Sequence, residues 1–174
     1  ALDFFEKAWH MEPGNAKFYT ARAAAKFELE DYTGCIQDAS KAIEMDSESC
    51  RAYFWRAKAY FRLENYDSAL RDASTSLRIN SEDRPWDPYY VIADAYTSLK
   101  NYDEGYKYAC HSIALNPACH IAYNIRSRAN RFLKRYDWAL ADATECIRLK
   151  PNYFRAYYQR AEAYLALENY DNAY

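Results

Sequence analysis

The hydrophobic and polar positions of the chain repeat at an almost constant interval. A tyrosine marks this interval, with spacings of 34, 36, 34 and 34 residues between Tyr32, Tyr66, Tyr102, Tyr136 and Tyr170. Self-similarity with a period of this size is typical of a solenoid, in which each repeat packs against its neighbours. The pattern therefore predicts an array of small repeated units.

Three other columns keep a fixed distance from this tyrosine. Leucine stands three residues before it, at Leu29, Leu63, Leu99, Leu133 and Leu167. A small residue stands nine residues before it, at Ala23, Ala57, Ala93, Ser127 and Ala161. Another small residue stands three residues after it, at Cys35, Ala69, Gly105, Ala139 and Ala173. Because small residues recur where two backbones approach closely, the columns predict a packed helical hairpin in each repeat.

Each hairpin is expected to contain two helices of about 13 residues, which are marginally stable alone and depend on stacking. The expected helix pairs are 16–29 with 33–45, 50–63 with 67–79, 88–99 with 103–115, and 120–133 with 137–149. The column that we expect to cap the second helices holds Thr33, Asp67, Asp103, Asp137 and Asp171.

We expect a single array over residues 1–174 that begins and ends within a repeat. Residues 1–15 match the second helix of a repeat, and residues 154–174 match a first helix. The whole repeats between them are 16–49, 50–83, 84–119 and 120–153. The third repeat carries a two-residue insertion, which is interpreted as a tolerated loop, with a binding loop as the alternative. The two half repeats favour a fragment of a longer protein.

Composition and charge narrow the function classes. The net charge of −2 and the pI of about 6.0 give no bulk attraction to nucleic acid or membrane. No apolar run approaches the roughly 18 residues that a membrane-spanning helix needs. The five cysteines form no C-x-x-C pair, which indicates reduced core thiols. We therefore expect a soluble protein of a reducing, cytoplasmic compartment, without nucleic-acid or membrane partners.

The repeat resembles the tetratricopeptide repeat (TPR), a helix-turn-helix unit of 34 residues, over the whole chain. The matching residues in the second and last repeats are Tyr53, Ala57, Tyr60, Tyr66, Ala69, Tyr157, Ala161, Tyr164, Tyr170 and Ala173. The sequence departs from the family pattern at Ala39, Ala73, Ala109, Ala143, Ser47 and Ser81. The resemblance implies an all-α, right-handed superhelical solenoid of antiparallel helix pairs.

The family's usual role is to hold a short peptide or a helix of a partner protein in the concave groove lined by the first helices. Arg-Ala and Asp-Ala pairs look like those of the co-chaperone branch, by analogy only. They begin at Arg22, Arg56, Arg160, Asp38, Asp72 and Asp142. The resemblance thus implies a non-enzymatic scaffold, either a co-chaperone or an assembly adaptor. The alternative is a regulatory or substrate-recognition arm of an enzyme whose catalytic domain lies outside this chain.

First-helix residues that face away from the small-residue columns are expected to line the groove. They are Arg51, Phe54, Trp55, Lys58, Arg62, Tyr90, Asp94, Asn124, Arg128, Arg131, Arg155, Tyr158 and Glu162. Basic residues outnumber acidic ones in this set, so an acidic segment with an apolar anchor is the expected ligand. The alternative is that Phe54 and Trp55 only bridge adjacent repeats and that the arginines are solvated.

Two specialised grooves of the family are not matched. The clamp for the C-terminal carboxylate of heat-shock chaperones needs lysine, asparagine and arginine on three consecutive first helices. Its columns in the first three repeats hold Thr20, Ala24, Trp55, Asp87 and Val91, and those in the last three hold Tyr90, Asp94, Ile125, Arg155 and Gln159. The column of the glycosyltransferase asparagine ladder holds Ala21, Trp55, Val91, Ile125 and Gln159. A chaperone partner would have to be bound without the clamp.

Catalytic, metal and cofactor sites find no support in the sequence. His10, His111 and His120 fall in unrelated columns, and the neighbouring cysteines match no helical metal motif. Three glycines are too few for a phosphate-binding loop. We expect no enzyme activity, no metal and no cofactor.

One architectural prediction comes from residues that change together. Arginine and aspartate stand sixteen residues apart in three repeats, whereas the third repeat has Ile92 and Tyr108 in their places. We expect ion pairs within the hairpins that fix their register. The predicted pairs are Arg22 with Asp38, Arg56 with Asp72, and Arg126 with Asp142.

Overall fold

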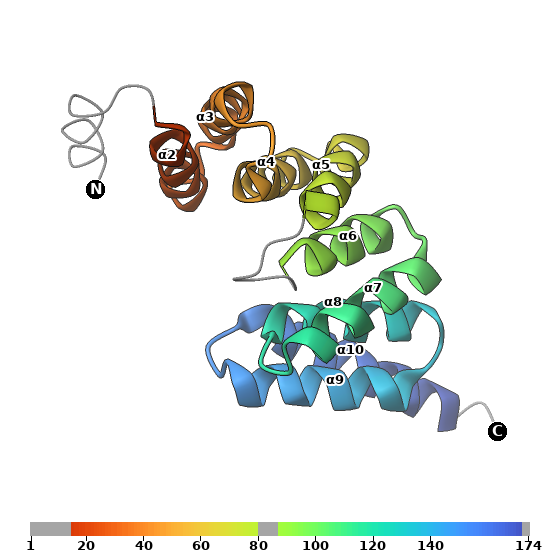
Figure 1. Cartoon of the computed structure of the whole chain (residues 1–174). Helices are drawn as coiled ribbons and strands as arrows, with labels where there is room; N and C mark the ends of the chain where they lie inside the picture. The colour runs from red at the N-terminus through yellow and green to blue at the C-terminus, as the bar shows by residue number, and fades with distance from the viewer. Residues whose placement is uncertain (1–14, 80–86, 172–174) are drawn as a thin grey trace. The chain divides into compact units, whose positions relative to one another are not determined.

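The computed structural model describes residues 15–79 and 87–171, with side chains as far as residue 167. These residues form nine helices and no strand, which confirms the predicted all-α fold (Figure 1). The helices are α2 (Ala16–Glu28), α3 (Tyr32–Met45), α4 (Cys50–Arg62), α5 (Tyr66–Ile79), α6 (Asp87–Ser98), α7 (Tyr102–Leu115), α8 (His120–Phe132), α9 (Tyr136–Leu149) and α10 (Phe154–Asp171). Residues 1–14 of the predicted first half repeat and residues 80–86 of the connector lie outside the described residues.

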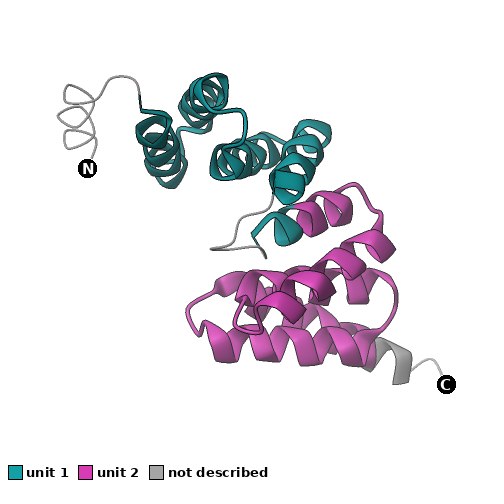
Figure 2. Ribbon diagram, in the orientation of Figure 1, with its two compact units in different colours: residues 1–91 teal, residues 92–174 magenta. Residues whose placement is uncertain are grey.

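The chain divides into two compact units, residues 1–91 and residues 92–174 (Figure 2). In unit 1, α2 packs on α3 and on α4, and α4 packs on α5. In unit 2, α8 packs on α9 and on α10, and α7 contacts α8. Within each unit a first helix therefore contacts both its own second helix and the first helix of the next repeat.

The small-residue columns lie where the two helices of a hairpin meet. Ala23 and Cys35 are completely buried between α2 and α3, and so are Ala57 and Ala69 between α4 and α5. Close packing at these positions gives each hairpin dispersion contacts along its whole seam and leaves no room for a larger side chain.

Serine takes the place of alanine in this column in the α8–α9 hairpin. The Ser127 hydroxyl is fully buried and donates a hydrogen bond of 2.7 Å to the carbonyl oxygen of Ala139. A buried hydroxyl is tolerated here because it has this partner.

The three predicted arginine–aspartate pairs are confirmed. Arg22 donates two hydrogen bonds to Asp38, from Nε at 2.8 Å and from Nη2 at 2.7 Å. Arg56 binds Asp72 in the same bidentate way. The third such pair joins Arg126 to Asp142. Each aspartate side chain is only 7% exposed, so each pair locks two helices in one register.

The α6–α7 hairpin has apolar contacts in place of the ion pair. Ile92 is 2% exposed, and Tyr108 stacks on Tyr96 with ring centroids 5.6 Å apart. A carboxylate in this apolar contact would have no guanidinium beside it, which explains why both charged residues are lost together.

Each hairpin turn is closed by a residue in the left-handed conformation. Glu30, Glu64, Lys100 and Lys134 have φ between 59° and 64°. The N–H of the next residue then bonds back to the first helix, as from Asn65 N to Tyr60 O at 2.9 Å. This turn is a Schellman motif, in which glycine usually occupies the left-handed position.

The caps of the second helices lie two residues earlier than predicted. The side chain of Asp31 accepts a hydrogen bond from Gly34 N at 2.8 Å, and that of Asn65 accepts one from Ser68 N at 3.2 Å. Thr33 and Asp67 lie inside the first turn instead. The correction follows from the Schellman motif, because its last residue is already placed to cap the next helix.

Helix α10 also differs from the prediction, since it continues to Asp171 through the expected turn after Leu167. In the other hairpins the turn places a non-glycine residue at positive φ. Packing against the returning helix offsets the conformational cost of this φ. The described residues contain no helix after α10, so helix propensity prevails there. In keeping with this, Ala161 is exposed whereas the other members of its column are buried.

The left-handed turn gives a test of local strain. Replacing Glu64 by glycine removes the Cβ that disfavours positive φ, at some cost in chain entropy. We expect Glu64→Gly to raise the free energy of unfolding by about 0.5–1 kcal/mol in urea denaturation followed by circular dichroism. Glu64→Ala keeps the Cβ and is the control without this gain. A glycine variant that is no more stable than the alanine variant would contradict the strain argument.

Candidate functional site

Six of the predicted groove residues lie in unit 1, and several of them take part in packing. Phe54 is 2% exposed, and its ring meets Tyr90 edge-on with centroids 6.1 Å apart. Arg51 Nη1 lies 2.8 Å from Asp87 Oδ2. These contacts join α4 to the start of α6, so Arg51, Phe54 and Tyr90 hold adjacent repeats together.

Trp55 borders the buried core between α2 and α3. This core contains Ala23, Phe27, Cys35 and Ala39, and the indole packs against it with its centroid 5.6 Å from that of Phe27. The side chain is half-buried and leaves part of its ring accessible beside Lys58. Trp55 therefore bridges two repeats and still offers some apolar surface.

Lys58 and Arg62 are one turn apart on α4 and lie over aromatic faces. Lys58 Nζ is 4.1 Å from the ring centroid of Phe27 and 4.3 Å from that of Trp55. The Arg62 guanidinium lies 4.8 Å from the ring centroid of Tyr32. Among the described residues neither cation has a carboxylate within ion-pair distance. Ring quadrupoles hold both charges, and the N–H donors remain available.

Burial makes the charge of Lys58 costly. Desolvation lowers its pKa from the ordinary value of 10.5 to about 8, against the opposing charges of Glu28 and Asp87. Burial also raises the pKa of the neighbouring Cys35 thiol to about 12, so this thiol stays protonated. The surroundings of Lys58 favour an incoming negative charge.

Four of the predicted groove residues of unit 2 form two ion pairs between neighbouring helices. Arg128 Nη2 on α8 lies 2.5 Å from Asp94 Oδ1 on α6. Arg131 Nη1 on α8 lies 3.3 Å from Glu162 Oε2 on α10. Both pairs are partly buried and help to stack the first helices. Asn124, also on α8, is 6% exposed and lies within the packed interior.

Arg62 on α4 is exposed, and in unit 2 Arg155 and Tyr158 are the exposed members of the predicted groove set. The latter two lie in the first two turns of α10, and Tyr158 is 57% exposed. The structure thus brings the predicted residues of each unit onto neighbouring first helices, and it gives most of them a packing role. Whether a ligand also contacts them stays a prediction.

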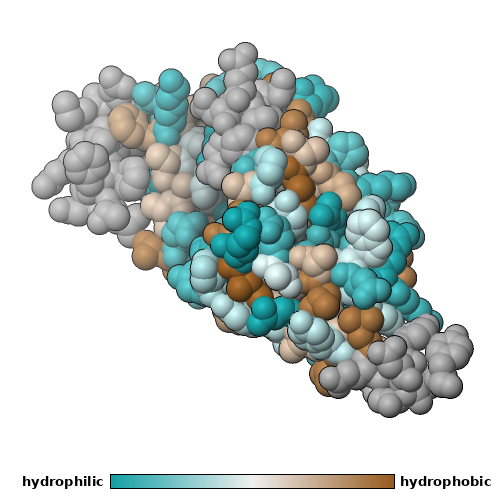
Figure 3. Space-filling model, turned by 90° about the horizontal axis from the view of Figure 1, so that it is seen from below, coloured by the Kyte–Doolittle hydropathy of each residue, from teal (hydrophilic) through white to brown (hydrophobic). Residues whose placement is uncertain are grey.

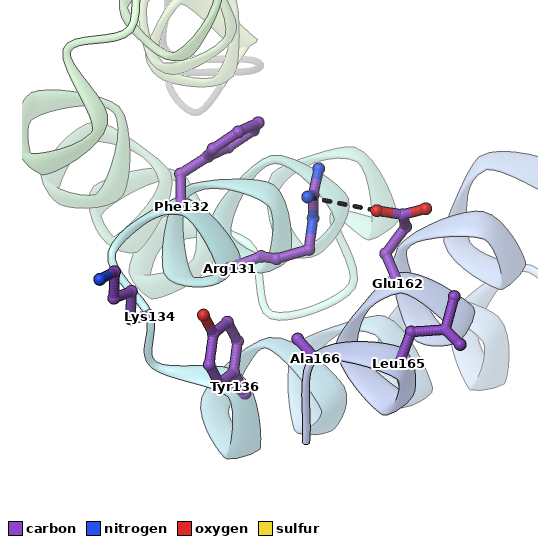
Figure 4. A pocket seen from close by; sticks show the side chains of 7 residues that line it. All are labelled: Arg131, Phe132, Lys134, Tyr136, Glu162, Leu165 and Ala166. Atoms are coloured by element: carbon purple, nitrogen blue, oxygen red, sulfur yellow. Dashed lines mark ion pairs between the residues drawn. The ribbon is translucent and has the colours of Figure 1, made fainter. Parts of the chain in front are cut away.

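A pocket of about 390 Å³ lies where α8, the turn to α9, and α10 meet (Figure 4). Its lining residues are Arg131, Phe132, Lys134, Tyr136, Glu162, Leu165 and Ala166. The predicted set contains Arg131 and Glu162 but not the other five. Leu165 and Phe132 lie near predicted groove positions on the same helices. The spacing of residues along the sequence, however, does not reveal an empty space between helices.

The surface and the titratable groups of the described residues give no other built site. The face in Figure 3 is mixed, with small separate groups of hydrophobic residues among hydrophilic ones. Within these residues no group of three histidine, cysteine or acidic side chains could hold a metal ion. All five cysteines are free thiols. No helix in the described part of the chain is long and apolar enough to cross a membrane.

Two family models match the chain. The model described as anaphase-promoting complex, cyclosome, subunit 3 matches residues 15–112. A tetratricopeptide repeat model matches residues 154–174. No curated protein matches the chain significantly.

Several solved structures share the fold. YrrB, described as a TPR protein with an unusual peptide-binding site, is 22% identical with a TM-score of 0.70, over 95% of this chain and 84% of that chain. A chain of the APC/C hetero-tetramer Cut9-Hcn1 is 16% identical with a TM-score of 0.87, over 97% of this chain and 33% of that chain. TTC0263, a thermophilic TPR protein of Thermus thermophilus, is 17% identical with a TM-score of 0.78, over 94% of this chain and 89% of that chain.

The buried ammonium of Lys58 makes stability depend on pH. Below pH 8 the folded and unfolded states are both protonated and the folded state bears the desolvation cost, whereas above pH 10.5 both are neutral and the cost is gone. The shift corresponds to about 3 kcal/mol, of which the aromatic faces offset about 1–2 kcal/mol.

We therefore expect Lys58→Met to be more stable than the wild type by about 1–2 kcal/mol at pH 7 in urea denaturation. The difference should shrink as the pH rises from 8 to 10. Lys17→Met, at an exposed lysine on α2, is the control without such a trend. A difference that stays constant from pH 7 to pH 10 would show that the ammonium carries no desolvation cost.

Proposed function

Because the chain belongs to the family described as anaphase-promoting complex, cyclosome, subunit 3, and its repeats are tetratricopeptide repeats, we propose that it is a non-enzymatic scaffold that binds an acidic segment of a partner protein. The segment lies along the groove-facing side of the first helices. The family match covers more than half of the chain, from residue 15 to residue 112.

The observation that supports this function best is the pair of cations on α4. Lys58 and Arg62 are held on aromatic faces without an ion pair to a carboxylate of the described residues. A carboxylate of a partner would supply the missing negative charge and relieve the desolvation cost of Lys58. An acidic ligand therefore fits this surface better than a basic or neutral one.

The ligand also needs an apolar anchor. Trp55 is half-buried, and its ring centroid is 4.3 Å from Lys58 Nζ, so a carboxylate that reaches Lys58 passes beside the indole. Aromatic side chains next to charges are typical of the residues that contribute most to binding energy. An acidic residue followed by a large apolar one is the segment that this surface suits.

An assembly adaptor is the subtype that we favour. The match to an anaphase-promoting complex subunit model supports a place in a multi-protein assembly. A co-chaperone remains the second candidate, on the analogy of the Arg-Ala and Asp-Ala pairs. An enzyme's regulatory arm is the third, and the sequence outside this chain would decide it. The buried free thiols of Cys35, Cys119 and Cys146 favour a reducing compartment such as the cytoplasm for any of them.

Selection from a random twelve-residue phage-displayed peptide library tests the ligand class. We expect the selected peptides to be enriched in aspartate and glutamate next to one large apolar residue. Lys58→Gln with Arg62→Gln should weaken the binding of a selected peptide roughly tenfold, since two charge contacts are lost. The matched control is Arg71→Gln with Arg78→Gln, at two exposed arginines on α5.

Two outcomes would overturn the proposed function. One is a selected set without acidic enrichment. The other is an equal loss of affinity in the α4 and α5 double variants, because that would show a general effect of net charge. Circular dichroism of both variants separates a loss of binding from a loss of fold.

The absent carboxylate clamp gives a second expectation. An isolated Glu-Glu-Val-Asp peptide should bind weakly or not at all, because capture of a terminal carboxylate needs several convergent donors. In the clamp columns of the first three repeats the chain offers Thr20, Ala24, Trp55, Asp87 and Val91. Isothermal titration calorimetry with the free-acid and amidated peptides measures this. A low-micromolar dissociation constant that is lost on amidation would refute it.

A further inference from the structure

The amino group of Lys58 lies against aromatic rings and not against a carboxylate. Its Nζ is 4.1 Å from the ring centroid of Phe27, 4.3 Å from that of Trp55 and 5.5 Å from that of Phe54. Among the described residues no carboxylate lies within ion-pair distance of it. The side chain is half-buried, so a small reagent can reach the amine from the open side of this cluster.

Three other lysines in the described part of the chain are bound to carboxylates. Lys26 Nζ lies 2.9 Å from Asp38, and Lys107 is paired with Glu104. Lys41 Nζ lies 2.9 Å from Glu44, and this hydrogen bond raises the pKa of Lys41. A bound carboxylate keeps an amine protonated and therefore unable to act as a nucleophile.

The charged groups around Lys58 come from several helices, and burial outweighs them. Burial lowers the pKa of Lys58 from 10.5 to about 8. Glu28 of α2, Asp87 of α6 and Cys35 of α3 act in the opposite direction. Arg51, on the same helix as Lys58, adds to the lowering. The attraction of the ring faces for a cation offsets part of it, and the amine still loses its proton more readily than an exposed lysine does.

We propose that Lys58 is an acylation site that accepts a short, uncharged acyl group from a thioester. The neutral amine attacks the carbonyl carbon of the thioester. The C–N bond forms, the C–S bond breaks, and the sulfur leaves as a thiolate that takes up the proton released by the nitrogen. The product is a neutral amide. It carries no charge to desolvate, and its alkyl part suits the apolar faces of Phe27 and Trp55.

Two opposing effects set the rate of this reaction. At pH 7 Lys58 has about ten times more free amine than an exposed lysine, once the attraction of the rings is included. The lower basicity weakens the amine as a nucleophile about threefold, on the Brønsted relation that thiols follow. The first effect is larger, so Lys58 should react about threefold faster than an exposed lysine.

This inference deepens the proposed function, on which its consequence for binding rests. Acylation removes the positive charge that we assign to an acidic ligand, and it leaves Arg62 as the single cation of the pair on α4. A thioester donor could therefore switch off binding at this surface without unfolding the hairpin.

Competition between lysines within one sample tests the site. The chain is incubated with S-acetyl-N-acetylcysteamine, a small neutral thioester, and the acetylation of each lysine is followed by mass spectrometry. We expect Lys58 to react about threefold faster than exposed Lys17 at pH 7. The ratio of the two rates should fall steadily from pH 7 to pH 10, because Lys17 still gains free amine where Lys58 has already lost its proton.

Removal of one ring tests the role of the aromatic cluster. Trp55→Ala gives water access to the amine, so the pH dependence of Lys58 acetylation should move toward that of Lys17. The matched control is Trp138→Ala, at a tryptophan on α9 that is 68% exposed, and it should leave the profile unchanged. Circular dichroism shows whether both variants remain folded, and the wild-type competition does not depend on either of them.

The effect on binding is measured with acetyl-lysine incorporated at position 58 during synthesis. This chain should bind an acidic peptide selected from the twelve-residue library about threefold more weakly than the unmodified chain, since one charge contact is lost. Acetyl-lysine at position 17 is the control and should not change the affinity.

The acylation site is overturned if Lys58 reacts no faster than Lys17 at pH 7, or if the ratio of their rates is the same at pH 7 and pH 10. Unchanged binding of the chain acetylated at position 58 would overturn the switch. Failure of the proposed function is distinct from both, because it shows as a library selection without acidic peptides. The acetylation rates are measured without any peptide and decide the site in either case.

Discussion

The close approach of the two helices within each hairpin is the constraint on which the rest of the structure depends. It requires side chains of almost no volume at the crossing, and Ala23, Cys35, Ala57 and Ala69 satisfy this with complete burial. A hairpin of two short helices still leaves most of its apolar side chains on outer faces. Because these faces must be covered, the first helices pack on one another within each unit, and the side chains expected to line the groove serve this stacking.

Much of the fold could be predicted because its determinants recur at fixed offsets. The helix pairs and the three arginine–aspartate bonds depend on contacts within one hairpin, where sequence spacing translates directly into spatial position. The caps were placed wrongly because two columns, one with Asp31 and one with Thr33, both hold residues that can cap a helix. The choice between them is made by backbone geometry, namely the left-handed turn at Glu30, which no residue type signals there.

The candidate site was less predictable, because its properties depend on neighbouring repeats. Spacing identifies Phe54 and Arg51 as groove-facing, but their burial is decided by Tyr90 and Asp87, which are 36 residues further along. The pocket in unit 2 is lined by residues of α8, of the turn to α9, of α9 and of α10, which come together only through the stacking of neighbouring repeats. A column of residue types shows which side chains are present, but it does not show the volume that they leave unfilled between neighbouring helices.

The two ways in which this chain holds its cations have different consequences for binding. A bidentate pair such as Arg126 with Asp142 uses the guanidinium donors fully, and separating it would leave a buried charge at a cost of about 3–5 kcal/mol. Lys58 is held instead by the faces of Phe27 and Trp55, which stabilise the charge without accepting its N–H donors in strong hydrogen bonds. A carboxylate can therefore be added to Lys58 without breaking an existing ion pair. Basic side chains thus fix the register of the helices inside the hairpins. On α4, in contrast, they keep their N–H donors available for a ligand.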